Sequence, residues 1–409
     1  MNSKLRSVVL LIVMLFTMGL GAVPAVAATD SDSIVADTLR VSLITCDPGP
    51  DVYQLFGHTA LRVQRSGAVP FDIVFNYGIF SFTDDFVLKF TKGETDYMLG
   101  VYDFDDFMID YVFRQSSVVE QELNLTPSQR QYLLDRLVDN ASPEHRIYRY
   151  NFLFNNCATR PRDLVKEVLL ADGSDLQYTP QDSTRTFRQI IHHYGANYSW
   201  LLFGIDLALG KDLDRVATWE EQMFIPLILN EAYDNATIES NGEVQPIVRS
   251  ECVLYDSGVV SVLPPTPWYL SPMFCAIVLL LIGVLITFYD IRKQRLSRWF
   301  DTILGVLCLL GSCIIYFLIF CSEHPATTFN INALWMTPLA IIPAFLPYIA
   351  VARKLVKVYH LLNMMLLALF LILALCGVQH INVAVFPLVM LLAMRSYNYI
   401  NYYKCHFVK

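Results

Sequence analysis

The sequence predicts an α+β domain on the outer side of a membrane, followed by an all-α bundle of about five transmembrane helices. Of its 409 residues 54% are apolar, and the mean hydropathy is positive, which is more apolar than an ordinary soluble protein of this size. Apart from the first 27 residues, the long apolar runs follow Pro267. Residues 28–268 instead alternate short strand-like and helix-like patterns broken by Pro, Gly and charges.

The first 27 residues have the three parts of a secretory signal peptide. Lys4 and Arg6 give a basic start, an apolar run follows, and the small residues Ala25-Val26-Ala27 end it. We expect cleavage after Ala27; the alternative is an uncleaved first transmembrane helix.

Composition divides the remainder into three parts. We expect residues 28–200 to form the exported domain, 201–268 a helical and strand extension with a linker, and 269–409 the transmembrane domain. The transmembrane domain has apolar runs near 269–289, 302–321, 333–351 and 359–378, and a shorter one near 381–395 that contains Pro387.

Basic residues are confined to alternate links between these runs. They occur in DIRKQRLSRWF, in the link from Arg353 to Lys357, and in the tail, to which we assign Arg395, Lys404 and Lys409. The links SEHPATTFNINALW and VQHIN contain none. The positive-inside rule therefore places the basic links and the C-terminus in the cytoplasm and the large domain outside. We expect no interior charge in any span, which argues against a transporter.

Residues 28–268 contain 35 acidic against 18 basic side chains. Nucleic acid is excluded as a partner, because binding phosphates needs a basic face. The expected partners are the lipid bilayer and a substrate of the cell envelope.

Strands are predicted where apolar and β-branched residues alternate between turn residues. The first covers residues 37–46, the second opens at Gly57-His58, and the third, 71–78, pairs antiparallel with the second. Further extended segments are expected at the start of 95–115 and in 118–126, 147–154 and 248–256.

Helices are predicted from cap residues and apolar periodicity. Segment 81–93 has Thr83 as a cap, and a second helix ends segment 95–115. Segment 126–142 starts with the cap Thr126 and Pro127. Segment 157–170 carries Pro161, which a helix tolerates only in its first turn.

Three cysteines lie in the exported part: Cys46, Cys157 and Cys252. In an oxidising compartment an odd number leaves at least one free thiol. A bond between Cys46 and Cys252 would leave Cys157 free. The chain has no C-x-x-C and no H-E-x-x-H motif, so we expect no metal and no cofactor.

Cys157 begins a predicted helix, with Arg160 and Arg162 in the turn that follows. Helix amides and cations both favour a thiolate, so this position suits a nucleophile. The two arginines could also contact a substrate carboxylate. The alternative is that they only pair with Asp163 and Glu167 on the solvated face of the helix.

A nucleophilic thiol needs a base, and His58 at the start of a central strand is the candidate. Asp72 or Asn76, on the neighbouring strand, could orient its imidazole. Asn155 and Asn156 either cap the helix that follows or donate to an oxyanion or substrate, and capping is the simpler role.

Five stretches resemble the Lnb N-terminal periplasmic domain family of exported bacterial proteins: FGHTALRV, FDIVFNYG, KFTKGETDYMLG, VVEQELNLT and YRYNFLFNNCATRPRDLV. The resemblance covers about residues 40–235. It implies a permuted papain-like (NlpC-type) domain, similar to the lecithin retinol acyltransferase group, in which the histidine strand precedes the cysteine helix. It also implies that His58 is the base and Cys157 the nucleophile, and that the membrane is the bacterial inner membrane.

The predicted function is a membrane-tethered cysteine hydrolase or acyltransferase acting on an amide or ester bond. The substrate would be a cell-wall peptide, a lipoprotein or a lipid. The alternative is a non-catalytic periplasmic binding or assembly module that helps an exported enzyme to mature.

One loop of the membrane part is a further candidate. Its polar and aromatic residues could contact a lipid or a lipid-linked substrate, or could simply be polar because the loop is at an interface. They are Glu323, His324, Asn330, Asn332 and Trp335.

Overall fold

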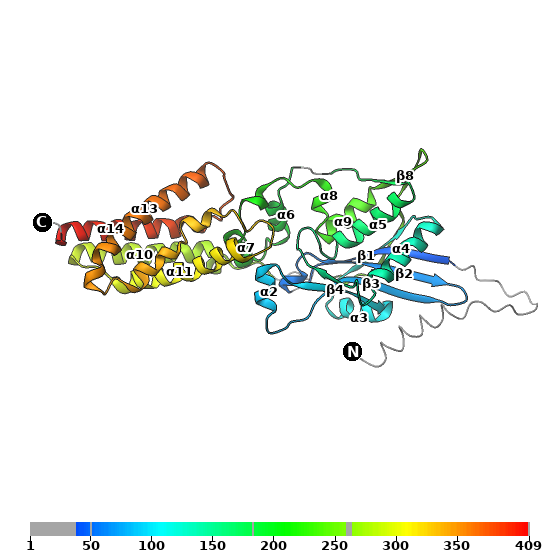
Figure 1. Ribbon diagram of the computed structural model, residues 1–409, viewed down its shortest axis with the longest axis horizontal. Coiled ribbons are helices and arrows are strands. Elements are labelled where there is room, and N and C mark those ends of the chain that lie inside the picture. Colours follow the sequence, from blue (N-terminus) through cyan, green and yellow to red (C-terminus); the bar gives the residue numbers. More distant parts are fainter. Residues whose placement is uncertain (1–37, 50, 182–183, 259–263, 408–409) are drawn as a thin grey trace, which may run out of the picture.

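The structure is a computed structural model that describes residues 38–49, 51–181, 184–258 and 264–407. A mixed α/β domain forms one end of an elongated molecule and a bundle of long helices forms the other (Figure 1). The predicted signal peptide lies outside the described residues.

The main sheet of the N-terminal domain has seven strands in the order β10-β5-β1-β2-β3-β4-β6, and all neighbours are antiparallel. The predicted antiparallel sheet and the pairing of the second and third strands are confirmed. The strands are β1 Thr38–Cys46, β2 His58–Ser66, β3 Phe71–Ile79, β4 Asp96–Asp103, β5 Val118–Leu123, β6 Ile147–Arg149 and β10 Val248–Tyr255.

Helices cover both faces of this sheet. One face packs on α4 (Pro127–Asn140), α5 (Thr159–Ala171) and α9 (Pro226–Asp234) around the larger core. The other face packs on α3 (Phe104–Phe113) around a smaller core. Odd-numbered residues of β2 and β3 enter the larger core and even-numbered ones face α3, as the two-residue strand period requires.

Cap predictions succeeded for α4 and failed for α2. Thr126 accepts the Gln129 N–H and Pro127 is the first helical residue, as expected. Helix α2 (Phe86–Lys92) instead begins after Asp85, which makes no side-chain cap bond, and the Thr83 hydroxyl donates to the Asp85 carboxylate at 2.6 Å.

The remaining elements of the N-terminal domain form a smaller layer beside the sheet. Strands β7, β8 and β9 make a second, three-stranded antiparallel sheet. Their bounds and those of the nearby helices are β7 Asp175–Gln177, α6 Phe187–Tyr194, α7 Ser199–Ala208, α8 Trp219–Gln222, β8 Thr237–Ser240 and β9 Glu243–Pro246, with short 3-10 turns at η1 Val52–Gln54 and η2 Lys211–Asp214.

Within the described residues, three helices are long and apolar enough to cross a membrane: Pro272–Lys293 (α10), Arg298–Cys321 (α11) and Ala350–Leu375, which contains α13 (Arg353–Leu375). The expected count of about five is not confirmed. The run near 333–351 is broken into η4 Ile331–Leu334, η5 Pro338–Ala340, α12 Ile341–Phe345 and η6 Ala350–Ala352, because Pro338, Pro343 and Pro347 interrupt it.

The predicted C-terminal tail is wrong: residues Val385–Phe407 form one helix, α14. It runs through the end of the fifth apolar segment, and Pro387 lies in its first turn. Arg395 is not a tail residue: it is 3% exposed and its guanidinium bonds Asp301 at 2.6 and 3.0 Å and Asp290 at 2.9 Å. The expectation that the helices carry no interior charge was therefore wrong.

The polar loop after α11 joins the two domains. The Asn332 and Asn330 side chains donate to carbonyls at the end of α7, at 3.0 and 2.7 Å. Trp335 is buried and donates to Asn332 at 2.9 Å, while Ser322 and Glu323 bond the end of α2. These residues stabilise the contact between the domains.

Candidate functional site

Cys157 lies in the turn that leads into α5. The Asn156 side chain accepts the N–H groups of Ala158 and Thr159, both at 2.9 Å, and its backbone oxygen accepts that of Arg160. Asn156 thus caps the helix one residue before Cys157. The thiol is half-buried and sits beside the positive end of the helix.

His58 is the first residue of β2 and reaches Asn76 on β3. Its Nε2 lies 2.6 Å from the Asn76 Oδ1, and Asn76 is buried. With Nε2 donating to the amide oxygen, Nδ1 is the nitrogen left for the thiol. An amide therefore fixes the tautomer and orientation of the imidazole.

Gly78 forms the floor beneath the thiol and the imidazole. It has φ +101° and lies where the pairing of β3 with β4 shifts register. A Cβ placed there would lie 3.5 Å from the Cys157 Cβ and 3.6 Å from the His58 Cε1. Gly78 therefore lies next to both side chains, within reach of one added methyl group.

The electrostatics of the two groups are coupled. Burial acts to raise the pKa of Cys157, but the charge and hydrogen bond of His58 and the Thr59 backbone N–H outweigh it and lower the pKa. Burial acts to lower the pKa of His58, but the Cys157 charge and hydrogen bond, with that of Asn76, raise it. Both directions favour a thiolate–imidazolium pair.

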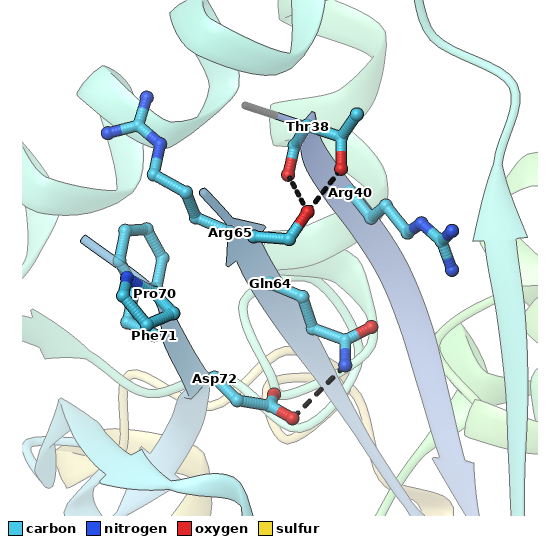
Figure 2. A pocket seen from close by; sticks show the side chains of 8 residues that line it. Thr38, Arg40, Gln64, Arg65, Pro70, Phe71 and Asp72 are labelled. Carbon is cyan, nitrogen blue, oxygen red and sulfur yellow. Dashed lines mark hydrogen bonds between the residues drawn. The ribbon is translucent and has the colours of Figure 1, made fainter. Parts of the chain in front are cut away.

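Asp72 is held elsewhere on the sheet. Arg62 bonds its carboxylate at 2.8 and 2.6 Å, and Gln64 donates to it at 3.1 Å, beside the hollow in Figure 2. Gln64 is the register partner of Asp72 and lies six residues from His58, roughly 20 Å along the strand. Of the two residues that could orient His58, the structure brings only Asn76 to it.

The other predicted contact residues are engaged in structural bonds. The Asn156 Nδ2 donates to the Phe152 and Phe224 carbonyls, both at 2.9 Å. Arg162 is buried and bonds Asp163 and the Glu220 carbonyl.

Arg160, three residues after Cys157, makes no bond to His58 or Asn76 among the hydrogen bonds of the described residues; its partners are Asn155 and Tyr148. Its Nε donates to the Asn155 Oδ1 at 2.6 Å, and its guanidinium lies 4.3 Å from the centre of the Tyr148 ring. Tyr148 is buried, and the structure gives its hydroxyl no hydrogen-bond partner among the residues it describes.

Sequence reasoning missed the neighbours that shape the imidazole's surroundings. The Tyr111 ring of α3 stacks on His58 with centroids 6.5 Å apart, and the Arg114 guanidinium lies 4.5 Å from the Tyr111 ring centre. The positive charge of Arg114 acts to lower the pKa of His58, against the larger effect of Cys157 that raises it. The glycine of FNYG was the available sign for Gly78, because a strand glycine often marks a close approach.

The cysteine pair suggested by the sequence is not formed. Cys46 and Cys252 are both free thiols. In the sheet, Cys46 of β1 lies opposite Val118 of β5. Cys252 of β10 lies opposite Glu120 on the other edge of β5. Because β5 lies between them, a disulfide cannot join them without rearranging the sheet.

Among the residues that the structure describes, one group of side chains has the composition of a metal site, and it lies at the contact between the domains. Ligand atoms of His192, Asp206 and His380 lie within 4.8 Å of one another. Asp206 already accepts bonds from Arg188 at 2.8 Å, His192 at 2.9 Å and Asn382 at 2.9 Å. The Asp206 carboxylate already accepts three hydrogen bonds and lies beside the buried Arg188 guanidinium. These contacts fit an ion network between the domains better than a cation site.

Comparison with known proteins adds two matches. Residues 27–192 match the Lnb N-terminal periplasmic domain, and residues 265–405 match the Lnb transmembrane domain. No curated protein and no solved structure matches the chain. The two matched regions follow the order of the two domains seen in the structure and together cover most of the sequence, so the chain belongs to the Lnb family and is a membrane protein with a periplasmic N-terminal domain.

Proposed function

We propose that the periplasmic domain is a permuted papain-like cysteine hydrolase or acyltransferase. The observation that carries this proposal is the alignment of the Cys157 thiol, the His58 imidazole and the Asn76 amide around Gly78. The substrate class is an amide or ester of the cell envelope: a cell-wall peptide, a lipoprotein or a lipid. About five spans in the inner membrane, of which the three long apolar helices are part, and a cytoplasmic C-terminus complete the proposed architecture.

The thiolate supplies the nucleophile. Cys157 Sγ attacks the carbonyl carbon, and a covalent thioester forms as the C–N or C–O bond breaks. The His58 imidazolium gives its proton to the leaving amine or alcohol. The neutral imidazole then takes a proton from the water, amine or alcohol acceptor that attacks the thioester, Cys157 leaves as a thiolate, and the thiolate–imidazolium pair is restored.

Two backbone N–H groups lie close to the Cys157 sulfur. Those of Thr59 and Cys157 both act to lower the pKa of the thiol, so they adjoin the atom that attacks the carbonyl, and we propose that they also donate to the carbonyl oxygen as it becomes an oxyanion. The Asn156 side chain has no free N–H to add, because its Nδ2 already donates to the Phe152 and Phe224 carbonyls. Backbone amides therefore supply the proposed oxyanion site.

Labelling with an iodoacetamide-type probe tests the dyad in the full-length protein near neutral pH. The chain supplies its own control thiol: Cys252 is exposed, but burial and Glu120 raise its pKa. We expect Cys157 to react faster than Cys252 although it is less exposed, and peptide mass spectrometry distinguishes the two sites.

Substitution completes the test. Cys157→Ala should remove the fast-reacting site and leave the labelling of Cys252 unchanged, and His58→Ala should slow the labelling of Cys157 to the rate of an ordinary buried thiol. Labelling that is unchanged in His58→Ala overturns the dyad. Full complementation of a deletion strain by Cys157→Ala overturns the enzyme and favours an assembly module.

A further inference from the structure

The segment around α2 carries apolar side chains that the described part of the chain leaves 40% or more exposed. Phe82 is 73% exposed, Val87 75%, Leu88 54% and Phe90 40%. We call these four residues the α2 apolar face. On a folded domain, contiguous exposed apolar side chains mark a contact with another apolar phase.

The C-terminal end of α2 is fixed to the end of a membrane-spanning helix. Helix α11 ends at Cys321, and the next residues bond the last turn of α2. The Ser322 hydroxyl donates to the Thr91 carbonyl at 2.8 Å, and the Glu323 N–H donates to the Lys92 carbonyl at 2.7 Å. The depth of α2 relative to the membrane is therefore set by α11.

Aromatic residues just before α10 indicate where the membrane–water interface lies, at the depth where α2 is held. Trp268 and Tyr269 are 73% and 52% exposed, and Trp200 of α7 donates to the Leu270 carbonyl at 2.7 Å. Tryptophan and tyrosine gather at membrane–water interfaces. Helices α10 and α11 are consecutive, so the start of one and the end of the other lie at the same end of the bundle, and α2 lies at the end of the periplasmic domain that faces the bundle (Figure 1).

We propose that the α2 apolar face is a membrane-contact surface that rests in the periplasmic leaflet of the bilayer spanned by the bundle. The occupant is phospholipid at the boundary between head groups and acyl chains. Lys89 and Lys92 flank the apolar residues and pair with Asp85 at 2.8 Å and Glu94 at 3.6 Å. Short amphipathic helices at interfaces have this mixture of large apolar and lysine side chains.

The contact continues to the candidate site along β3. Strand β3 ends one residue beyond Gly78, and Phe80 follows it; the Phe80 ring stacks on Phe86 of α2 at 5.3 Å and on Tyr97 of β4 at 4.9 Å. A helix seated on lipid is thus joined through packed rings to the residue beneath Cys157 and His58. The surface stands independently of whether that site is catalytic.

Photo-crosslinking tests the surface. Benzoylphenylalanine is placed at Phe82 or Val87 in the full-length protein, which is reconstituted in nanodiscs of phosphatidylethanolamine and phosphatidylglycerol. Val244 on β9 is the matched control, because it is 64% exposed and β9 pairs with β8 at the end of the domain away from the bundle (Figure 1).

After irradiation we expect protein carrying the mass of one phospholipid at positions 82 and 87, and none above the unirradiated background at 244. Lipid adducts at all three positions would overturn the proposal, as would crosslinks to a second copy without lipid or no adduct at 82 and 87. Gel filtration and thermal unfolding of each variant establish that it is folded before irradiation.

Discussion

Removing the Asn76 amide should weaken the reactivity of Cys157. The Nε2–Oδ1 distance of 2.6 Å and the burial of Asn76 make this a short bond to the charged form of His58. Hydrogen bonds to charged groups contribute about 1.5–3 kcal/mol, and about 1.36 kcal/mol is a tenfold change in rate. Asn76→Ala should therefore slow alkylation of Cys157 at pH 7 by up to about 10- to 100-fold.

The assay is the alkylation rate of the Cys157 peptide, followed by mass spectrometry in the full-length protein. Asn76→Asp should retain most of the rate, because it keeps an oxygen acceptor opposite Nε2. Asp72→Asn is the matched control: it should lower stability by about 1–2 kcal/mol through its bonds to Arg62, yet leave the rate unchanged. A wild-type rate in folded Asn76→Ala, or an equal loss in Asp72→Asn, would refute this reasoning.

Three further outcomes are expected. Gly78→Ala should lower stability by about 1–3 kcal/mol, because alanine is strained at φ +101°, whereas its Cβ would lie at ordinary van der Waals distance from Cys157 and His58. Melting curves measure the loss, and an unchanged melting temperature contradicts the strain assigned to this position. The alkylation rate should rise with pH, with a midpoint below that of an ordinary cysteine, because the pKa of Cys157 is lowered in the folded protein. His58→Ala should move the midpoint upward, because burial of the thiol is then no longer offset by the imidazolium. An unchanged midpoint in His58→Ala contradicts the ion pair. Arg395→Leu should destabilise the bundle by about 3–5 kcal/mol, because it leaves the buried carboxylates of Asp290 and Asp301 without their partner. Thermal unfolding in detergent measures this loss, and a loss well under about 1 kcal/mol contradicts the network.

Much of this protein follows from local patterns in its sequence. The Thr126-Pro127 start of α4, the strand opening at His58 and the turn before Cys157 are each specified by a few neighbouring residues. Caps, strand alternation and proline placement act over one or two turns, so they are legible without a fold. The apolar runs likewise indicate a membrane part, because the bilayer demands long apolar stretches.

Tertiary structure decided what depends on register and on packing between distant segments. Asp72 and Asn76 lie on the same face of β3, and the strand period cannot distinguish them; only the pairing of β2 with β3 puts Asn76 beside His58 and Asp72 beside Gln64. Arg395 looked like a cytoplasmic tail charge until the packing of α14 buried it between carboxylates of α10 and α11. A side chain's charge and hydrogen-bonding capacity are fixed by its chemistry, but its partners are chosen by which segments fold against it.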